Sequence, residues 1–231
     1  QMAAHFGRER PVVSFAEQAD RYRDARMMAV IVNSDSETTS GIPGAPNDLL
    51  GKAQADHPDV FLAFAGIDPW KGEAAIAEIR RMHDEYGIRG VGELNPSRQK
   101  FLANDRRFFP IWETCAELGL VVMFHSGFPG AGAGTPGGGG FRLENARPVR
   151  NIDYVAAEFP ELNIISAHPA WPWHLENLAM VWHKSNVYLD LSGWAPKYLP
   201  PEVVRYADTL ISDRVLFGSD WPVMTAERGM D

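Results

Sequence analysis

The chain has 231 residues, 45% of them hydrophobic and 23% charged, which is the composition of a globular protein rather than a disordered or fibrous one. Its net charge of −8 argues against binding to nucleic acid or to an anionic membrane, because both need a basic surface. We therefore expect one domain over residues 1–231 and a small-molecule partner. Cys115 is the only cysteine, so no intrachain disulfide can form and a cytoplasmic protein is favoured.

Short apolar runs alternate with longer amphipathic segments along the chain, which is the pattern of repeated strand–helix units. We expect strands at residues 28–32, 60–65, 90–94, 120–124, 162–166, 187–191 and 215–218. Helices are expected between them, among others at residues 14–26, 71–86, 108–118 and 151–159. The alternation predicts an α/β fold of the TIM (β/α)8 barrel type.

The expected barrel is incomplete, because seven strands are one short of closure. No strand precedes the helix at 14–26, and no covering helix follows the last strand. We expect both ends to be truncated, with the first strand supplied before Gln1 and the last helix after Asp231.

A glycine-rich stretch at residues 130–140 directly follows the fourth expected strand. It is either a flexible loop over a functional site or a mobile insertion, and the sequence leaves both readings open.

Three of the expected strands deliver a polar side chain just before a turn, namely His125, His168 and Asp220. Each histidine alone is as well explained by a buried ring bonded to backbone, and Pro169 predicts extended geometry for His168. Their joint occurrence favours a shared site, because the carboxyl ends of barrel strands open onto one face. Two imidazoles and a carboxylate suit a divalent metal.

Four sequence words give the chain a family resemblance. They are Phe-His125-Ser-Gly, Ala-His168-Pro-Ala-Trp-Pro-Trp, Asn186-Val-Tyr-Leu-Asp-Leu-Ser-Gly193-Trp and Leu-Phe-Gly-Ser-Asp220-Trp-Pro. With these motifs the chain resembles the amidohydrolase-2 branch of the metal-dependent amidohydrolases, the branch that includes aminocarboxymuconate-semialdehyde decarboxylase. Their order and spacing are specific, although each word alone is weak.

The resemblance implies one divalent metal at the mouth of a TIM barrel, usually zinc and in some members manganese. It implies that His125 is a ligand, that Asp220 is a ligand and a base, and that His168 activates or orients water. Members of this branch also carry a His-x-His or Glu-x-His pair on the first strand, and no His-x-His occurs here. Either residues before Gln1 supply it, which we favour, or the chain is a relative that no longer holds metal.

Five further residues are candidates for binding a substrate. Glu93 and Asn95 stand where many relatives of this branch carry a basic residue and a histidine, and a structural role at the strand end is the alternative. Trp171, Trp194 and Trp221 follow expected strand ends, where they form the wall of an apolar pocket or pack under loops.

The first expectation for function is a metal-dependent hydrolase. It would act on a lactone, amide or β-keto bond of a small, aromatic-derived carboxylic acid through a metal-activated water. The alternative is a non-oxidative decarboxylase, a carboxy-lyase with the same ligands, and the third candidate is a metal-free relative that only binds small molecules. Whether the chain forms a homo-oligomer is left open.

Overall fold

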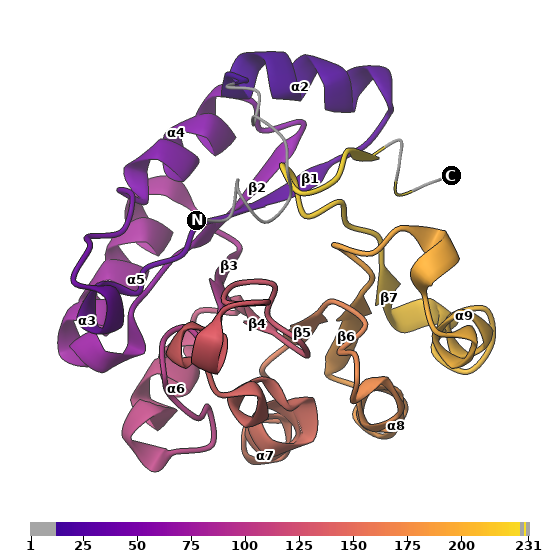
Figure 1. The fold of residues 1–231 in the computed structure, drawn as a ribbon. Helices are drawn as coiled ribbons and strands as arrows, with labels where there is room; N and C mark the ends of the chain where they lie inside the picture. The colour runs from indigo at the N-terminus through magenta and orange to yellow at the C-terminus, as the bar shows by residue number, and fades with distance from the viewer. Residues whose placement is uncertain (1–12, 227–228, 230–231) are drawn as a thin grey trace.

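A single sheet of parallel strands forms the centre of the computed structural model, which describes residues 13–226 and 229 (Figure 1). Seven strands follow one another in chain order, and every neighbouring pair is parallel. They are β1 (Ala29–Val32), β2 (Phe61–Ala65), β3 (Gly90–Leu94), β4 (Val121–His125), β5 (Ile164–Ala167), β6 (Val187–Asp190) and β7 (Val215–Leu216). All seven expected strands are confirmed.

The helices cover the outer side of the curled sheet (Figure 1). They are α2 (Phe15–Asp24), α3 (Glu37–Ser40), α4 (Asp48–Asp56), α5 (Glu73–Tyr86), α6 (Phe109–Glu117), α7 (Tyr154–Glu158), α8 (His174–His183) and α9 (Pro201–Ala207). Ser14 and Glu17 form a capping box at the start of α2, and Gly87 ends α5 in the left-handed conformation. Among the described residues, no helix is both long and apolar enough to cross a bilayer.

The helix expected at residues 151–159 is more complicated than its sequence pattern indicates. Val149–Asp153 form a turn of π-helix, and α7 begins only after it. The buried Asn151 accounts for the wide turn, because its side chain accepts from the Ala103 backbone N–H and donates to the Arg147 carbonyl. The helix thus widens to tie a neighbouring loop to its own backbone.

The sheet is a curled, incomplete barrel with β1 and β7 as its edges. Apolar side chains stand exposed along both edges, with Val30 41% and Val32 43% exposed on β1 and Leu216 38% exposed on β7. The centre of the sheet is different, because all four residues of β5 are buried, as in a strand covered on both faces. The prediction of an incomplete TIM barrel is confirmed, whereas the residues expected beyond either end remain a prediction.

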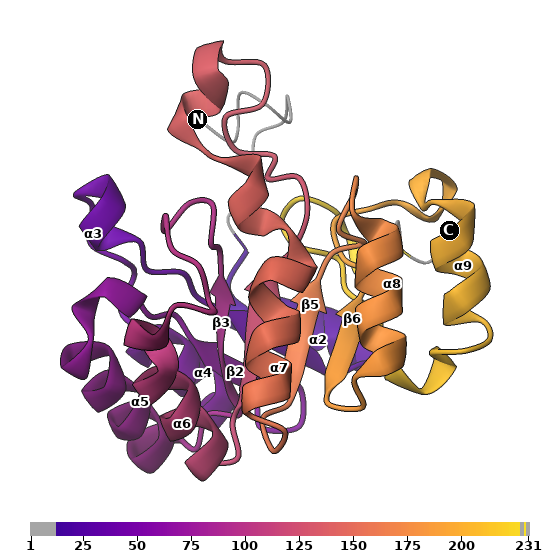
Figure 2. The same cartoon turned by 90° about the horizontal axis from the view of Figure 1, so that it is seen from below.

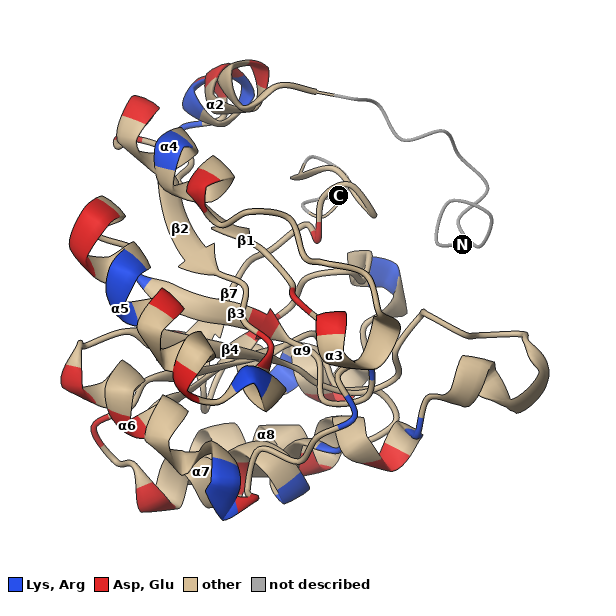
Figure 3. Cartoon of the chain, turned by 90° about the vertical axis from the view of Figure 1, so that its left-hand side faces the viewer, with Lys and Arg blue, Asp and Glu red and all other residues tan. Residues whose placement is uncertain are grey.

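Two surface features bear on the sequence expectations. The glycine-rich segment 130–140 stands out from the end of the barrel, beyond the body of the helices (Figure 2). Acidic and basic residues are interspersed along the outer helices (Figure 3). On α5, for example, Arg81 forms ion pairs with Glu78, Glu85 and Asp48 of α4.

Candidate active site

The carboxyl ends of neighbouring strands bring the polar residues together. Glu93 lies on β3, His125 ends β4 and His168 follows β5. Asp190 ends β6, and Asp220 follows β7 by a short turn. Because all these strands are parallel, their ends open onto the same face of the sheet.

Glu93 lies between the two imidazoles. Its Oε1 is 2.8 Å from Nδ1 of His125 and 3.2 Å from Nε2 of His168. The two rings meet edge to face, with their centroids 4.7 Å apart. The side chains of His125, His168 and Glu93 are only 10%, 12% and 22% exposed, so the three groups interact largely out of bulk water.

Asp220 lies near His168, beside Gly193. A Cβ placed on Gly193 would lie 3.1 Å from Nδ1 of His168 and 3.3 Å from Oδ2 of Asp220. The structure therefore brings together all three residues that the sequence singles out at strand ends. The catalytic and metal-binding roles assigned to them remain predictions.

His168 and Asp220 share an uncommon backbone conformation. Their φ angles are +70° and +55°, in the left-handed region that residues with a side chain seldom adopt. The extended geometry expected for His168 before Pro169 is therefore wrong. The contacts of its ring with Glu93 and with Ser192 hold the residue in place, and such backbone strain is often found at functional sites.

The charges in the group are set by mutual contact. Burial alone would raise the pKa of Glu93, but hydrogen bonds and charge from His125 and His168 outweigh it and leave that pKa well below its usual range. Burial would likewise lower the pKa of His168, yet Glu93, with Asp220 and Asp190, raises it to about 10. Burial dominates at His125 and lowers its pKa. These shifts favour the carboxylate form of Glu93, the charged form of His168 and the neutral form of His125.

The donor atoms fit a divalent metal ion. One ligand atom each from Glu93, His125 and His168 lie within 4.8 Å of one another. In addition, Nε2 of His125 is buried without a hydrogen-bond partner among the described residues, and a neutral imidazole nitrogen is a good metal ligand.

A cavity of about 490 Å³ adjoins the polar group. Glu93, His168, Asp190, Ser192 and Asp220 form its polar part. The rest of the lining is mostly apolar and comes from β1, from the segment around β7, and from residues that include Met123, Ile165 and Trp221. Such a pocket, apolar with a few converging polar groups, is typical of a site for a small molecule.

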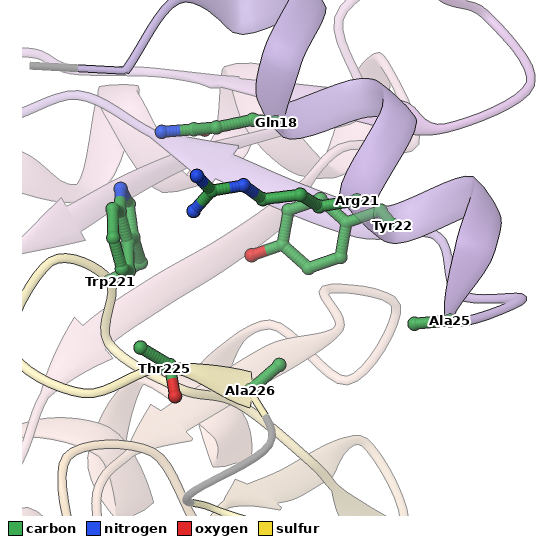
Figure 4. A pocket seen from close by; sticks show the side chains of 7 residues that line it. All are labelled: Gln18, Arg21, Tyr22, Ala25, Trp221, Thr225 and Ala226. Carbon is green, nitrogen blue, oxygen red and sulfur yellow. The ribbon is translucent and has the colours of Figure 1, made fainter.

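A smaller pocket lies between α2 and the segment after β7 (Figure 4). Gln18 and Tyr22 line both pockets, and the Arg21 guanidinium reaches towards Trp221 (Figure 4). Trp221 lines both pockets as well, so it borders the larger cavity where the sequence places a substrate wall.

The other predicted substrate contacts, Asn95, Trp171 and Trp194, are not among the residues that line the cavity. Trp171 is 45% exposed and its ring is 5.9 Å from that of Phe128 and 6.5 Å from that of Trp194, so the three form an aromatic group. Asn95 uses its side-chain oxygen to accept from the Arg98 backbone N–H, which supports the structural alternative for that residue. Substrate contact by these residues remains a prediction.

Asp190 and Ser192 are two site residues that the sequence reasoning missed. Ser192 contacts the His168 ring through both its carbonyl and its hydroxyl oxygen, and Asp190 hydrogen-bonds Ser192. A usable signal was present, because Val-Tyr-Leu-Asp190 repeats the pattern of an apolar strand that ends in a polar residue.

Comparison with known proteins identifies the family. A family model described as amidohydrolase (Amidohydro_2) matches residues 4–231. The chain belongs to this amidohydrolase family. Over 79 residues it is 30% identical to a 2-amino-3-carboxymuconate-6-semialdehyde decarboxylase from Dictyostelium discoideum, a match that covers 34% of this chain and 22% of that protein.

Two solved structures show the same fold. A TIM-barrel protein from Bordetella bronchiseptica superposes with a TM-score of 0.75 at 23% identity, over 99% of the present chain and 79% of the Bordetella chain. A dihydroxybenzoic acid decarboxylase from Polaromonas sp. JS666, with bound manganese and the inhibitor 2-nitroresorcinol, gives a TM-score of 0.62 at 19% identity, over 92% and 76% of the two chains. At these identities the likeness shows the fold alone.

Proposed function

We propose that this protein is a metal-dependent decarboxylase of a small, hydroxylated aromatic carboxylic acid. One observation carries the proposal: the group of Glu93, His125, His168 and Asp220 at one end of an apolar cavity. The relatives from Dictyostelium and Polaromonas, both decarboxylases, support this reaction over the hydrolysis that we expected first.

The metal would be held by His125 through Nε2, together with Glu93 and Asp220. A bound divalent ion supplies positive charge that anchors a carboxylate and a neighbouring hydroxyl oxygen of the substrate. The resemblance favours zinc, while the manganese in the Polaromonas decarboxylase supports manganese. The donor set of imidazole and carboxylate suits both ions.

The residues of the chain would bind the ring and move one proton. The apolar lining of the cavity would hold the ring and exclude water. The bond between the ring carbon and the carboxyl carbon breaks, carbon dioxide leaves, and the electron pair that stays on the ring carbon takes a proton from Nε2 of His168. Burial opposes the charged form of His168, whereas Glu93 and, to a smaller extent, the Asp220 carboxylate stabilise it and raise the pKa of that ring.

The decisive experiment measures metal content and carbon dioxide together. The full product of the gene, loaded with zinc or with manganese, is incubated with 2,6-dihydroxybenzoate, with 5-carboxyvanillate and with a panel of aromatic lactones. We expect carbon dioxide release from an aromatic acid that depends on the metal. Lactone opening without carbon dioxide would support hydrolysis instead, and a protein that binds no metal and turns over neither class would support a binding role.

A small molecule is the partner that this proposal implies. The cytoplasmic location expected from the cysteine content, and the open question of a homo-oligomer, are predictions that the proposal leaves unchanged.

A further inference from the structure

A short chain of hydrogen bonds reaches His168 from the side opposite Glu93. The Ser192 hydroxyl donates to Oδ2 of Asp190, and the Ser192 backbone N–H donates to Oδ1 of the same carboxylate over 3.3 Å. Nδ1 of His168 then lies 2.9 Å from the Ser192 carbonyl oxygen and 3.1 Å from its hydroxyl oxygen. Asp190 is 6% exposed and Ser192 is 7% exposed, so water competes little for these bonds.

The direction of these bonds follows from counting protons. A serine hydroxyl has one proton, and here it is donated to the Asp190 carboxylate. The hydroxyl oxygen can then only accept from His168, and the carbonyl oxygen of Ser192 is an acceptor in any case. Both atoms that face Nδ1 are therefore acceptors, so Nδ1 must carry a proton.

We propose that Asp190 and Ser192 are positioning residues that keep a proton on Nδ1 of His168, so that Nε2 is the nitrogen that exchanges a proton. Nε2 faces Glu93 at the polar end of the cavity. The inference deepens the proposed function, and its kinetic consequence rests on that function. Its structural consequence, the position of the proton on the ring, does not.

Two glycines hold the pair in place. A Cβ on Gly218 would lie 2.5 Å from Oδ1 of Asp190 and 2.8 Å from Cβ of Ser192, which is closer than atoms can approach. Gly193, in the left-handed conformation at φ +76°, brings its backbone against the His168 ring in the same way. The chain therefore packs bare backbone against both ends of the hydrogen-bond chain, which leaves Asp190 and Ser192 little room for other rotamers.

A purely structural role for Asp190 is the competing explanation. In that case the carboxylate would only brace the turn after β6 through the Ser192 backbone N–H, and a polar residue of the same shape would replace it without effect on His168. The two explanations differ in what Asp190→Asn does to the ring.

Asp190→Asn should reverse the hydrogen-bond chain without a change of shape. Because the Ser192 backbone N–H must still find an oxygen, the amide oxygen takes the place of Oδ1 and the amide NH₂ faces the Ser192 hydroxyl. The hydroxyl then accepts from the amide and donates to Nδ1 of His168, which favours a proton on Nε2. Adding Ser192→Ala removes that donor, so the carbonyl oxygen of Ser192 should restore the proton to Nδ1.

The experiment reads the ring directly by ¹⁵N NMR of the histidine side chains. The His168 signals are identified by their absence in His168→Gln. The pH is then raised until their chemical shifts no longer change, so that the neutral ring of each variant is compared. If the protein unfolds first, all variants are compared in a Glu93→Gln background, because loss of that carboxylate lowers the pKa of His168. Exposed Asp208→Asn is the matched control.

We expect the ratio of the Nδ1–H to the Nε2–H form to fall about tenfold in Asp190→Asn, since one net hydrogen bond changes sides, and to recover in the double variant. With the substrate found in the carbon dioxide assay, kcat should fall about 10- to 100-fold with KM nearly unchanged, and should rise again on adding Ser192→Ala. An unchanged ring in Asp190→Asn, or a double variant no better than the single one, overturns the inference. If no substrate is turned over, the NMR result still decides it, so its failure is distinguishable from failure of the proposed function.

Discussion

At the scale of single residues, Glu93 shows how a role depends on neighbours that are distant in the sequence. Its position at the end of β3 made it a candidate for binding substrate, whereas its Oε1 contacts both His125 and His168. His125 and His168 in turn differ in how many of their ring nitrogens already have a partner. His125 presents a buried Nε2 without a partner among the described residues, and His168 is bonded on both nitrogens.

This difference predicts different effects of removing each ring. His125→Ala should lose both metal and turnover, because it removes the nitrogen best placed as a ligand. His168→Ala should keep most of the metal and lose turnover at least about 100-fold, as expected for a group that transfers a proton. Metal content by mass spectrometry and carbon dioxide release measure the two effects. Equal loss of metal in both variants would make His168 a ligand instead.

Cys115 gives a second prediction at this scale. The thiol is buried in α6, and burial raises its pKa to about 12. A thiolate is the reactive form, and its fraction at pH 8 falls tenfold for each unit by which the pKa rises above that pH. We expect the native protein to react with a thiol reagent at least about 1000-fold more slowly than the same protein in denaturant. Rapid reaction of the native protein would show that the helix opens readily or that the thiol is less buried.

At the scale of elements, Asn47 connects α4 to its surroundings. Its amide accepts from the Gly66 backbone N–H at 2.9 Å and donates to the Gly66 carbonyl at 3.0 Å. It also donates to Glu78 of α5. The loop after β2 and the neighbouring helix are thus held by one buried side chain that precedes α4.

Asn47→Ala should therefore lower the free energy of unfolding by about 2–3 kcal/mol, because it leaves buried backbone groups of Gly66 without partners. Urea unfolding followed by circular dichroism measures this as a lower midpoint at constant slope. Exposed Asn163→Ala is the control and should change the stability by less than about 0.5 kcal/mol. A loss for Asn47→Ala no larger than the control would mean that the loop finds other partners.

The helices and strands also show which structural features a short stretch of sequence can predict. The strands were predictable because a run of four to six apolar residues between amphipathic stretches is typical of a buried strand. The end of α5 was predictable because a glycine such as Gly87 readily adopts the left-handed conformation of a helix cap. The π-helical turn before α7 was not, because it depends on the contact of Asn151 with Ala103 across a gap of 48 residues in the sequence.

At the scale of the whole molecule, we expect that binding of a metal at the site stabilises the folded protein. The proposed ligands come from different strands of the sheet, so an ion that binds them together favours the folded state over the unfolded chain. Such binding stabilises by about 2.7 kcal/mol at a metal concentration 100 times the dissociation constant.

Zinc or manganese should therefore raise Tm by roughly 5–10 °C for a chain of this length, and a chelator should reverse the rise. Differential scanning fluorimetry measures the shift, with magnesium and the His125→Ala variant as controls. An equal shift in His125→Ala would place the ion elsewhere in the molecule.

The sequence by itself determined the repeating strand–helix units, the incomplete barrel, the family, and the three polar residues at strand ends. These features follow from patterns within short segments of the sequence and do not depend on which other segments pack against them. Only the tertiary structure decided that Glu93 lies between two imidazoles and that Asp190 reaches His168 through Ser192. It alone also gave His168 its left-handed backbone. The physical reason is that contacts between side chains of different segments depend on the curvature of the sheet and on where glycine allows close approach of the backbone. The spacing of residues along one segment predicts neither of these.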